Sequence, residues 1–183
     1  TKLIVVIPCY NETKLIRSLA SLKACIIPSD ICVDVITVIN HSERASDTIK
    51  QRNQQTYEDA VTFGEQHSNE SLQFLTLKAF DLPKKHAGVG LARKIGMDEA
   101  LYRFQELNED GVICCFDADS LCQNNYLEVI YQSFQDNTIN GASIHFEHPI
   151  EGDEYASNIY KVSIDYELHL RYYKNAIRYT GVP

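Results

Sequence analysis

The sequence predicts an α/β domain built on a mostly parallel sheet. Four short apolar runs are rich in β-branched residues, and they lie at residues 2–8, 31–39, 72–80 and 111–117. The segments between them carry apolar residues at helical spacing. Because strand–helix–strand units align successive strands in parallel and cover both faces of the sheet with helices, we expect a Rossmann-like three-layer α/β/α sandwich.

The helices between the strands are predicted from their caps and their apolar spacing. We expect the first to begin near residues 11–13, where Asn and Thr can cap exposed N–H groups, and to end at Pro28. Its apolar face would consist of Leu15, Leu19, Leu22 and Ile26. Two more helices are predicted at about residues 44–66 and 88–107, and both are expected to pack on the sheet.

The chain after the fourth run predicts a helix, a strand and a long helix. Asn125 and Glu128 have the spacing of a capping box at the start of the first of these. A strand is then expected over residues 139–147, and a tyrosine-rich helix over about 153–179. Its tyrosines can pack against the sheet or line an acceptor site, because tyrosine has an apolar ring and a polar tip.

Composition limits the possible function classes. The chain has 25 acidic and 17 basic residues, a net charge of −8, and no basic stripe of the kind that binds nucleic acid. No apolar stretch approaches the ~20 residues of a membrane span. The N-terminal TKLIVVIPCY is too short for the apolar region of a secretory signal and lacks its cleavage site, so we expect a cytoplasmic protein, free or at the cytoplasmic face of the membrane. The 6 cysteines form no CxxC pair and are expected to be reduced core residues rather than zinc ligands. An anionic ligand would therefore need a cation as an intermediary.

The strongest candidate site follows the fourth run. Asp117 and Asp119 stand one residue apart where that strand is expected to end, at the carboxyl edge of the sheet. Two such carboxylates can hold a divalent cation, Mn²⁺ or Mg²⁺, that in turn binds diphosphate oxygens. The alternative is that both aspartates only end the strand and cap the following turn.

The first strand is also predicted to end in polar residues. Pro8 fixes the chain direction, Tyr10 offers a flat ring for stacking, and Asn11 and Glu12 offer hydrogen-bonding groups. A nucleoside could bind there, or Asn11 could simply cap the following helix.

Two further segments bring polar groups to the same edge. Asn40 and His41 follow the second run, and Arg93 lies in the glycine-containing segment 84–96 at the start of a predicted helix. Arg93 could bind a base or phosphate, or pair with an aspartate. Three strand ends therefore supply nucleotide-binding groups to one edge of the predicted sheet.

In these motifs the sequence resembles the GT-A glycosyltransferases of the inverting, family 2 type, over roughly residues 3–148. The opening strand with PCYNE, the GVGLARKIG segment and DAD occur in the family's order and approximate spacing. The resemblance implies that the matching residues bind the donor: Tyr10 stacks on the base, Glu12 approaches the ribose, Asn40 reads the base edge, Arg93 supports the base, Asp117 contacts ribose or metal, and Asp119 binds Mg²⁺ or Mn²⁺.

The resemblance also implies an activity, which is transfer of a sugar from a nucleotide-diphosphate sugar, with UDP preferred, to the hydroxyl of a glycan, lipid-linked or other acceptor. Ile39-Asn40 replaces the family's usual Asp-Asp, and an asparagine donates as well as accepts hydrogen bonds. We expect residues 1–183 to form one nucleotide-sugar-binding domain that ends before the family's base-bearing segment. Asp165 and Glu167 are later carboxylates, and neither is assigned as the base.

Other function classes fit less well. A haloacid-dehalogenase-like phosphatase also uses a strand followed by DxD, but on its first strand, and Leu121 stands where that family prefers Thr or Val. Gly88, Gly90 and Arg93 do not form the G-x-G-x-x-G of a dinucleotide site. A non-catalytic nucleotide-sugar-binding module remains an alternative.

Overall fold

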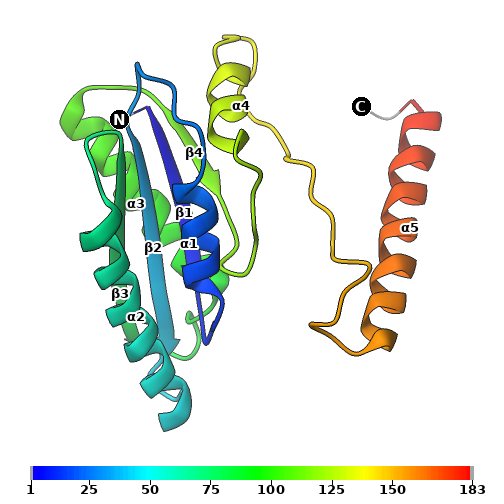
Figure 1. Cartoon of the computed structure of the whole chain (residues 1–183). Coiled ribbons are helices and arrows are strands. Elements are labelled where there is room, and N and C mark those ends of the chain that lie inside the picture. The colour runs from blue at the N-terminus through cyan, green and yellow to red at the C-terminus, as the bar shows by residue number, and fades with distance from the viewer. Residues whose placement is uncertain (1, 182–183) are drawn as a thin grey trace. The chain divides into compact units, whose positions relative to one another are not determined.

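The computed structural model describes residues 2–181. The chain divides into two compact units, Thr1–Asn140 and Gly141–Pro183, each taken by itself below. Within the described residues, the first unit holds the strands β1–β4 and the helices α1–α4, and the second holds α5 (Figure 1). The single domain predicted for residues 1–183 stays a prediction.

The core of the first unit is a four-stranded parallel sheet. Its strands are β1 (Leu3–Cys9), β2 (Val33–Ser42), β3 (Leu72–Leu82) and β4 (Val112–Cys115), in the order β3-β2-β1-β4. β1 pairs with β2 on one side and with β4 on the other, both in parallel. The predicted α/β class is therefore confirmed.

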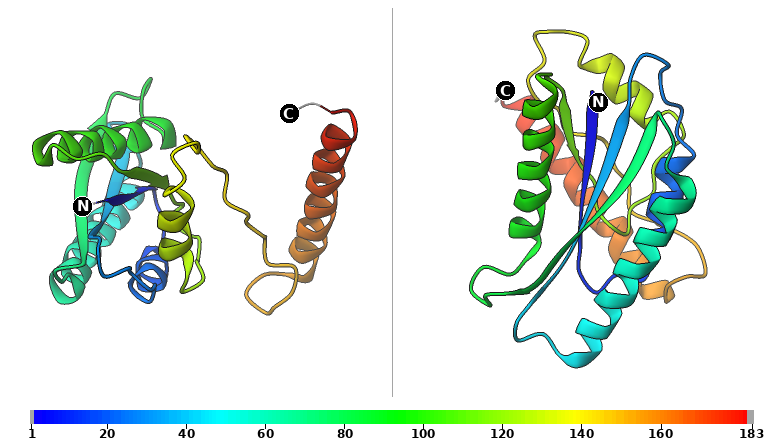
Figure 2. Two further views of the ribbon diagram at one scale, coloured as in Figure 1. Left: turned by 90° about the horizontal axis from the view of Figure 1, so that it is seen from above. Right: turned by 90° about the vertical axis from the view of Figure 1, so that its left-hand side faces the viewer.

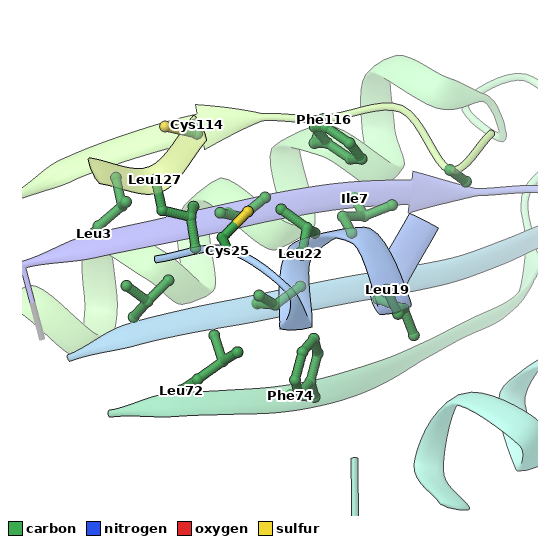
Figure 3. Close-up of a cluster of buried hydrophobic side chains, with 14 of the residues drawn as sticks. Leu3, Ile7, Leu19, Leu22, Cys25, Leu72, Phe74, Cys114, Phe116 and Leu127 are labelled. Atoms are coloured by element: carbon green, nitrogen blue, oxygen red, sulfur yellow. The ribbon is translucent and has the colours of Figure 1, made fainter. Parts of the chain in front are cut away.

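Helices cover both faces of this sheet (Figure 2). On one face, side chains of α1 (Leu15–Lys23), α2 (Asp47–His67) and α4 (Tyr126–Ser133) join a core with alternate residues of β1 and β2. Figure 3 shows part of this cluster. On the other face, α3 (Val89–Leu107) packs on the intervening strand residues. Because both faces are covered, β1 is buried along its whole length.

The first helix begins later and ends earlier than predicted. It starts at Leu15, with Lys14 as the N-cap residue. Asn11 cannot belong to the helix, because its backbone is left-handed with φ 51°. Glu12, rather than Asn11 or Thr13, satisfies the N–H groups before the helix: its Oε1 accepts from Thr13 N at 2.8 Å and Lys14 N at 2.7 Å. The helix ends at Lys23, so Ile26 lies outside it and is exposed.

The capping box predicted before α4 does not form. Asn125 is the N-cap residue, but its side chain makes no cap hydrogen bond, and its ψ of 3° departs from the extended conformation that such a cap requires. The helix forms nevertheless, because Leu127 and Ile130 are buried in the core.

The second unit contains α5 (Ser157–Tyr179) and the segment before it. The strand predicted over residues 139–147 is wrong: the segment forms no ladder, and residues 139–147 are exposed. An apolar run becomes a strand only when a partner satisfies its N–H and C=O groups. Within α5 only Tyr160 and Glu167 are buried. None of the helices within residues 2–181 is both long enough and apolar enough for a membrane span.

Candidate functional site

A pocket opens beyond the carboxyl ends of β1, β2 and β4. The chain runs from β1 to β2 on one side, and later returns to place β4 on the other side of β1, so the strand order reverses between β1 and β4. Ligands of open α/β sheets bind at such a reversal. The lining residues come from all three strand ends and from α3: Pro8, Cys9, Tyr10, Glu12, Asn40, Val89, Asp117, Ala118 and Asp119.

Six of the predicted site residues thus line one pocket, and three do not. Pro8, Tyr10, Glu12, Asn40, Asp117 and Asp119 are among its lining residues. Asn11, His41 and Arg93 lie outside the lining. Asn11 and His41 both contact Asn53 of α2, and Arg93 donates to the lining residue Asp117.

The turn after β1 presents an exposed ring and a partly engaged carboxylate. Tyr10 is 51% exposed, which leaves a face of its ring open to a stacking partner. Glu12 lines the pocket while its Oε1 accepts the N–H groups before α1. The turn is therefore held partly by one of its own site residues.

Asn40 lines the pocket and has a buried acceptor atom without a partner. The residue is 1% exposed, and its Nδ2 donates to Gly88 O at 3.5 Å. Its Oδ1 has no hydrogen-bond partner within the described part of the chain. Because burying an unpaired acceptor is unfavourable, an N–H group that reached this oxygen would be stabilised by it.

His41 lies behind the pocket rather than in it. Its ring is 2% exposed, packs against Phe80 with 4.1 Å between ring centroids, and places Nδ1 3.3 Å from Asn53 Nδ2. Nε2 lies 3.6 Å from Asp81 Oδ1. Burial lowers the pKa of His41, so the neutral imidazole is favoured.

The DAD segment presents both of its carboxylates to solvent. Asp117 and Asp119 are exposed while Ala118 between them is buried. Ala118 and Asp119 form a turn, in which Ser120 N donates to Asp117 O at 3.1 Å. Arg93 Nη2 donates to Asp117 Oδ1 at 3.0 Å, which is the aspartate pairing left open above. The Nε of Arg93 is buried and has no partner among residues 2–181.

Side chains of helix α1 bind the DAD segment and the loop that follows it. Ser18 Oγ donates to Ala118 O at 2.8 Å, and both groups are buried. Further along, Cys122 N donates to Ser21 Oγ at 3.4 Å, and the Sγ atoms of Cys25 and Cys122 lie 3.6 Å apart. The two aspartates therefore lie in a loop that α1 holds by hydrogen bonds at Ala118 and Cys122.

Two residues that shape the site were not predicted. Ser18 interrupts the apolar face formed by Leu15, Leu19 and Leu22, and a polar residue at that position was a usable signal. Asn53 is fully buried in α2 and bonds both Asn11 and Asn40. It lies in a helix rich in polar residues, where nothing marked it as buried.

The described residues contain no cluster of three or more His, Cys, Asp or Glu side chains that could hold a metal ion. Any cation at the DAD segment would therefore meet at most two protein carboxylates. Mg²⁺ is commonly bound in this way, through one or two carboxylates together with substrate phosphates.

The chain matches the family model for glycosyl transferase family 2 over residues 4–181. No curated protein matches its sequence significantly. Among solved structures, it is similar to a crystal structure of S. aureus TarS 1-349, with a TM-score of 0.46 and 16% identity over 80% of this chain and 39% of that one. TarS 1-349 in complex with UDP-GlcNAc gives a TM-score of 0.46 and 15% identity, over 80% of this chain and 38% of that chain. The chain thus spans 39% or less of these structures.

Proposed function

The chain belongs to glycosyl transferase family 2, and on this basis we propose that it binds a nucleotide-diphosphate sugar in the pocket between β1 and β4 and transfers the sugar, with inversion, to an acceptor hydroxyl. The observation that carries the proposal is the convergence of polar groups at the strand reversal. Tyr10, Asn40 and the two aspartates come from three strand ends and line one pocket. This arrangement supplies a stacking surface, a buried acceptor and two carboxylates within one site.

The two aspartates would hold a divalent cation, Mn²⁺ or Mg²⁺, together with the donor diphosphate. Both are exposed and adjacent to the pocket, and the lack of a third protein ligand in the described chain suits a cation that also binds phosphate oxygens. When bound, such a cation stabilises the negative charge of the departing diphosphate. Arg93 would orient Asp117 through their ion pair.

Asn40 favours a base that offers an N–H donor at its edge. Its Nδ2 is engaged by Gly88 O, so the group left for a ligand is the Oδ1 acceptor. Uracil presents N3–H to such an acceptor, whereas the corresponding N3 of cytosine is itself an acceptor. We therefore expect UDP to bind more tightly than CDP, and the replacement of the family's aspartate by asparagine does not remove the acceptor.

The acceptor half of the reaction is assigned no residue. Glu167 accepts hydrogen bonds from His148 N at 3.1 Å and Nδ1 at 2.7 Å, and the His148 partner lowers the pKa of this carboxylate. A carboxylate already engaged in this way is poorly suited to take a proton from a hydroxyl. The acceptor, a glycan, lipid-linked or other hydroxyl compound, and the cytoplasmic location stay predictions.

The metal role is tested by Asp119→Ala. We expect calorimetry of UDP with Mn²⁺ to show a loss of at least about tenfold in affinity, because the variant removes one of two carboxylates from the cation. Wild-type protein without Mn²⁺ should bind UDP about as weakly as the variant does with it.

Asp98→Ala is the matched control, because Asp98 is also exposed and acidic but lies on α3 in a pair with Lys94. Its UDP affinity should equal that of wild type. Equal affinity of Asp119→Ala and wild type, with both proteins folded, would rule out the metal role. GDP, CDP and dTDP in place of UDP identify the preferred base.

A further inference from the structure

A fully buried asparagine in α2 links the ends of β1 and β2. Asn53 is 0% exposed, although most of the side chains around it on α2 are polar and at least partly exposed. Its Oδ1 accepts from Asn11 N at 2.8 Å, and its Nδ2 donates to Asn40 O at 2.8 Å. The partners lie 42 and 13 residues away in the sequence. One side chain therefore connects the turn after β1 to the last residues of β2.

The remaining proton of this amide has a partner as well. Asn53 Nδ2 lies 3.3 Å from His41 Nδ1, which is an acceptor when the proton of the neutral ring is on Nε2. Both N–H groups and the Oδ1 atom of the Asn53 amide therefore each have a partner at one of the two strand ends. A buried amide whose polar atoms are all paired fixes geometry, because a displacement would leave a buried polar atom unpaired.

The bond to Asn11 restrains a backbone conformation that is uncommon outside glycine, although asparagine tolerates it better than most residues. Asn11 has φ 51°, in the left-handed region that few residues other than glycine occupy. It separates Tyr10 from Glu12, so its backbone angles decide where both of these pocket residues point. Thr56, nearly one turn further along α2, adds a bond from its Oγ1 to Glu12 O at 3.3 Å.

We propose that Asn53 is a positioning residue for donor binding, which keeps Tyr10 and Asn40 on facing sides of one pocket. Asn53 is not among the residues that line the pocket, and it would act through Asn11 and Asn40. This inference rests on the proposed function insofar as the pocket binds a nucleotide. Its structural part, the restraint on the turn after β1, does not depend on any ligand.

The restraint should appear as donor affinity, because a site that is ordered before binding loses less entropy when the ligand binds. In Asn53→Ala we expect UDP with Mn²⁺ to bind at least about tenfold more weakly, measured by calorimetry at a temperature where circular dichroism shows the variant to be folded. The matched control is Phe63→Leu, on the same helix but packed against Phe74 and away from the turn. It should lower the melting temperature and leave the affinity of the folded protein unchanged.

A second measurement tests the restraint without ligand. Amide hydrogen exchange followed by NMR should become faster at Asn11 N–H in Asn53→Ala and remain unchanged in Phe63→Leu. If Asn53→Ala does not fold, Asn53→Asp takes its place, since it keeps the size and the acceptor facing Asn11 but removes the donor to Asn40 O. It should weaken UDP binding while Asn11 stays protected.

The outcomes separate this inference from the proposed function. Failure of the wild-type protein to bind any nucleotide would overturn the proposed function, whatever the exchange data show. UDP binding by wild type that is unchanged in the folded Asn53 variant would overturn the positioning role alone. Unaltered exchange at Asn11 in Asn53→Ala would overturn it as well.

Discussion

His41 is held neutral by its surroundings, and this has a consequence for stability. Burial has the largest effect on the pKa of His41 and lowers it; Lys50 and Lys78 lower it further, and Asp81 opposes them. Protonation would also place an N–H on Nδ1 opposite the amide of Asn53, which is a donor itself. The charged form is therefore disfavoured in the folded protein on two independent grounds.

Acid should accordingly destabilise the fold through this residue. In the unfolded chain a histidine takes up its proton at a pKa of about 6.5, whereas folded His41 does so only at lower pH. The contribution of neutral His41 is thus fully present above about pH 6.5 and is lost as pH falls toward the lower folded pKa. We expect the melting temperature to decrease between about pH 7.5 and about pH 5.5, and His41→Gln to reduce this decrease.

His86→Gln serves as the control for this prediction, because His86 is an exposed histidine of the loop between β3 and α3. It should retain the pH dependence of wild type. Lys50 lowers the pKa of the Asp81 carboxylate, so Asp81 stays ionised over the pH range in which His41 is tested. Identical slopes for His41→Gln and wild type would show that His41 does not carry the effect.

Some site residues could be predicted from sequence because their position is a local property. Asp117 and Asp119 directly follow a buried run, and Tyr10 and Asn40 lie near the ends of two others, so all four were expected at the carboxyl edge. The role of Asn53, in contrast, depends on a tertiary contact between α2 and a residue 42 positions away in the sequence. No periodicity or motif in α2 indicates that Asn53 contacts Asn11 and Asn40. Likewise, nothing in the sequence indicates that His41 is buried behind the pocket rather than lining it.

At the scale of elements, α3 approaches the sheet closely at Gly96. A Cβ at this position would lie 2.4 Å from Val6 Cγ1 and 3.1 Å from Val38 Cγ2. Helix propensity alone favours alanine over glycine by up to about 1 kcal/mol, whereas overpacking a core costs about 1–3 kcal/mol. Because the clash involves β-branched side chains on two strands, we expect Gly96→Ala to destabilise the protein.

Chemical denaturation measures this effect. Gly90→Ala is the matched control in the first turn of the same helix, where a Cβ meets nothing within 4 Å, and it should be neutral or slightly stabilising. Val6→Ala combined with Gly96→Ala should recover part of the loss by making room for the new methyl group. A Gly96→Ala variant as stable as wild type would mean that α3 can shift outward, and Arg93 would shift with it.

The bounds of elements show which sequence signals were sufficient. The three strands β1, β2 and β3 and the helices α2 and α3 lie close to their predicted ranges, because long apolar or amphipathic patterns are strong local signals. The start of α1 differed because the conformation of Asn11 depends on Asn53, a tertiary contact. The predicted strand at 139–147 differed because strand formation requires a partner, and the run by itself contains no information about one.

At the scale of the whole molecule, the chain's topology explains why the pocket belongs to one unit. The strand reversal lies between β1 and β4, and the lining residues span Pro8 to Asp119. Both buried core clusters are likewise made of residues between Leu3 and Phe134. The residues that line the pocket in the described part of the chain therefore all belong to the unit Thr1–Asn140.

We therefore expect residues 1–140 to fold and bind donor without the remainder of the chain. Calorimetry should give a UDP affinity, in the presence of Mn²⁺, within about threefold of that of the 183-residue chain, and urea denaturation should show one cooperative transition. Residues 141–183 alone should be largely unfolded, because α5 buries only Tyr160 and Glu167 and isolated helices are marginally stable in water. A truncated protein that unfolds without cooperativity, or that has lost UDP binding while folded, would show that the second unit completes the first.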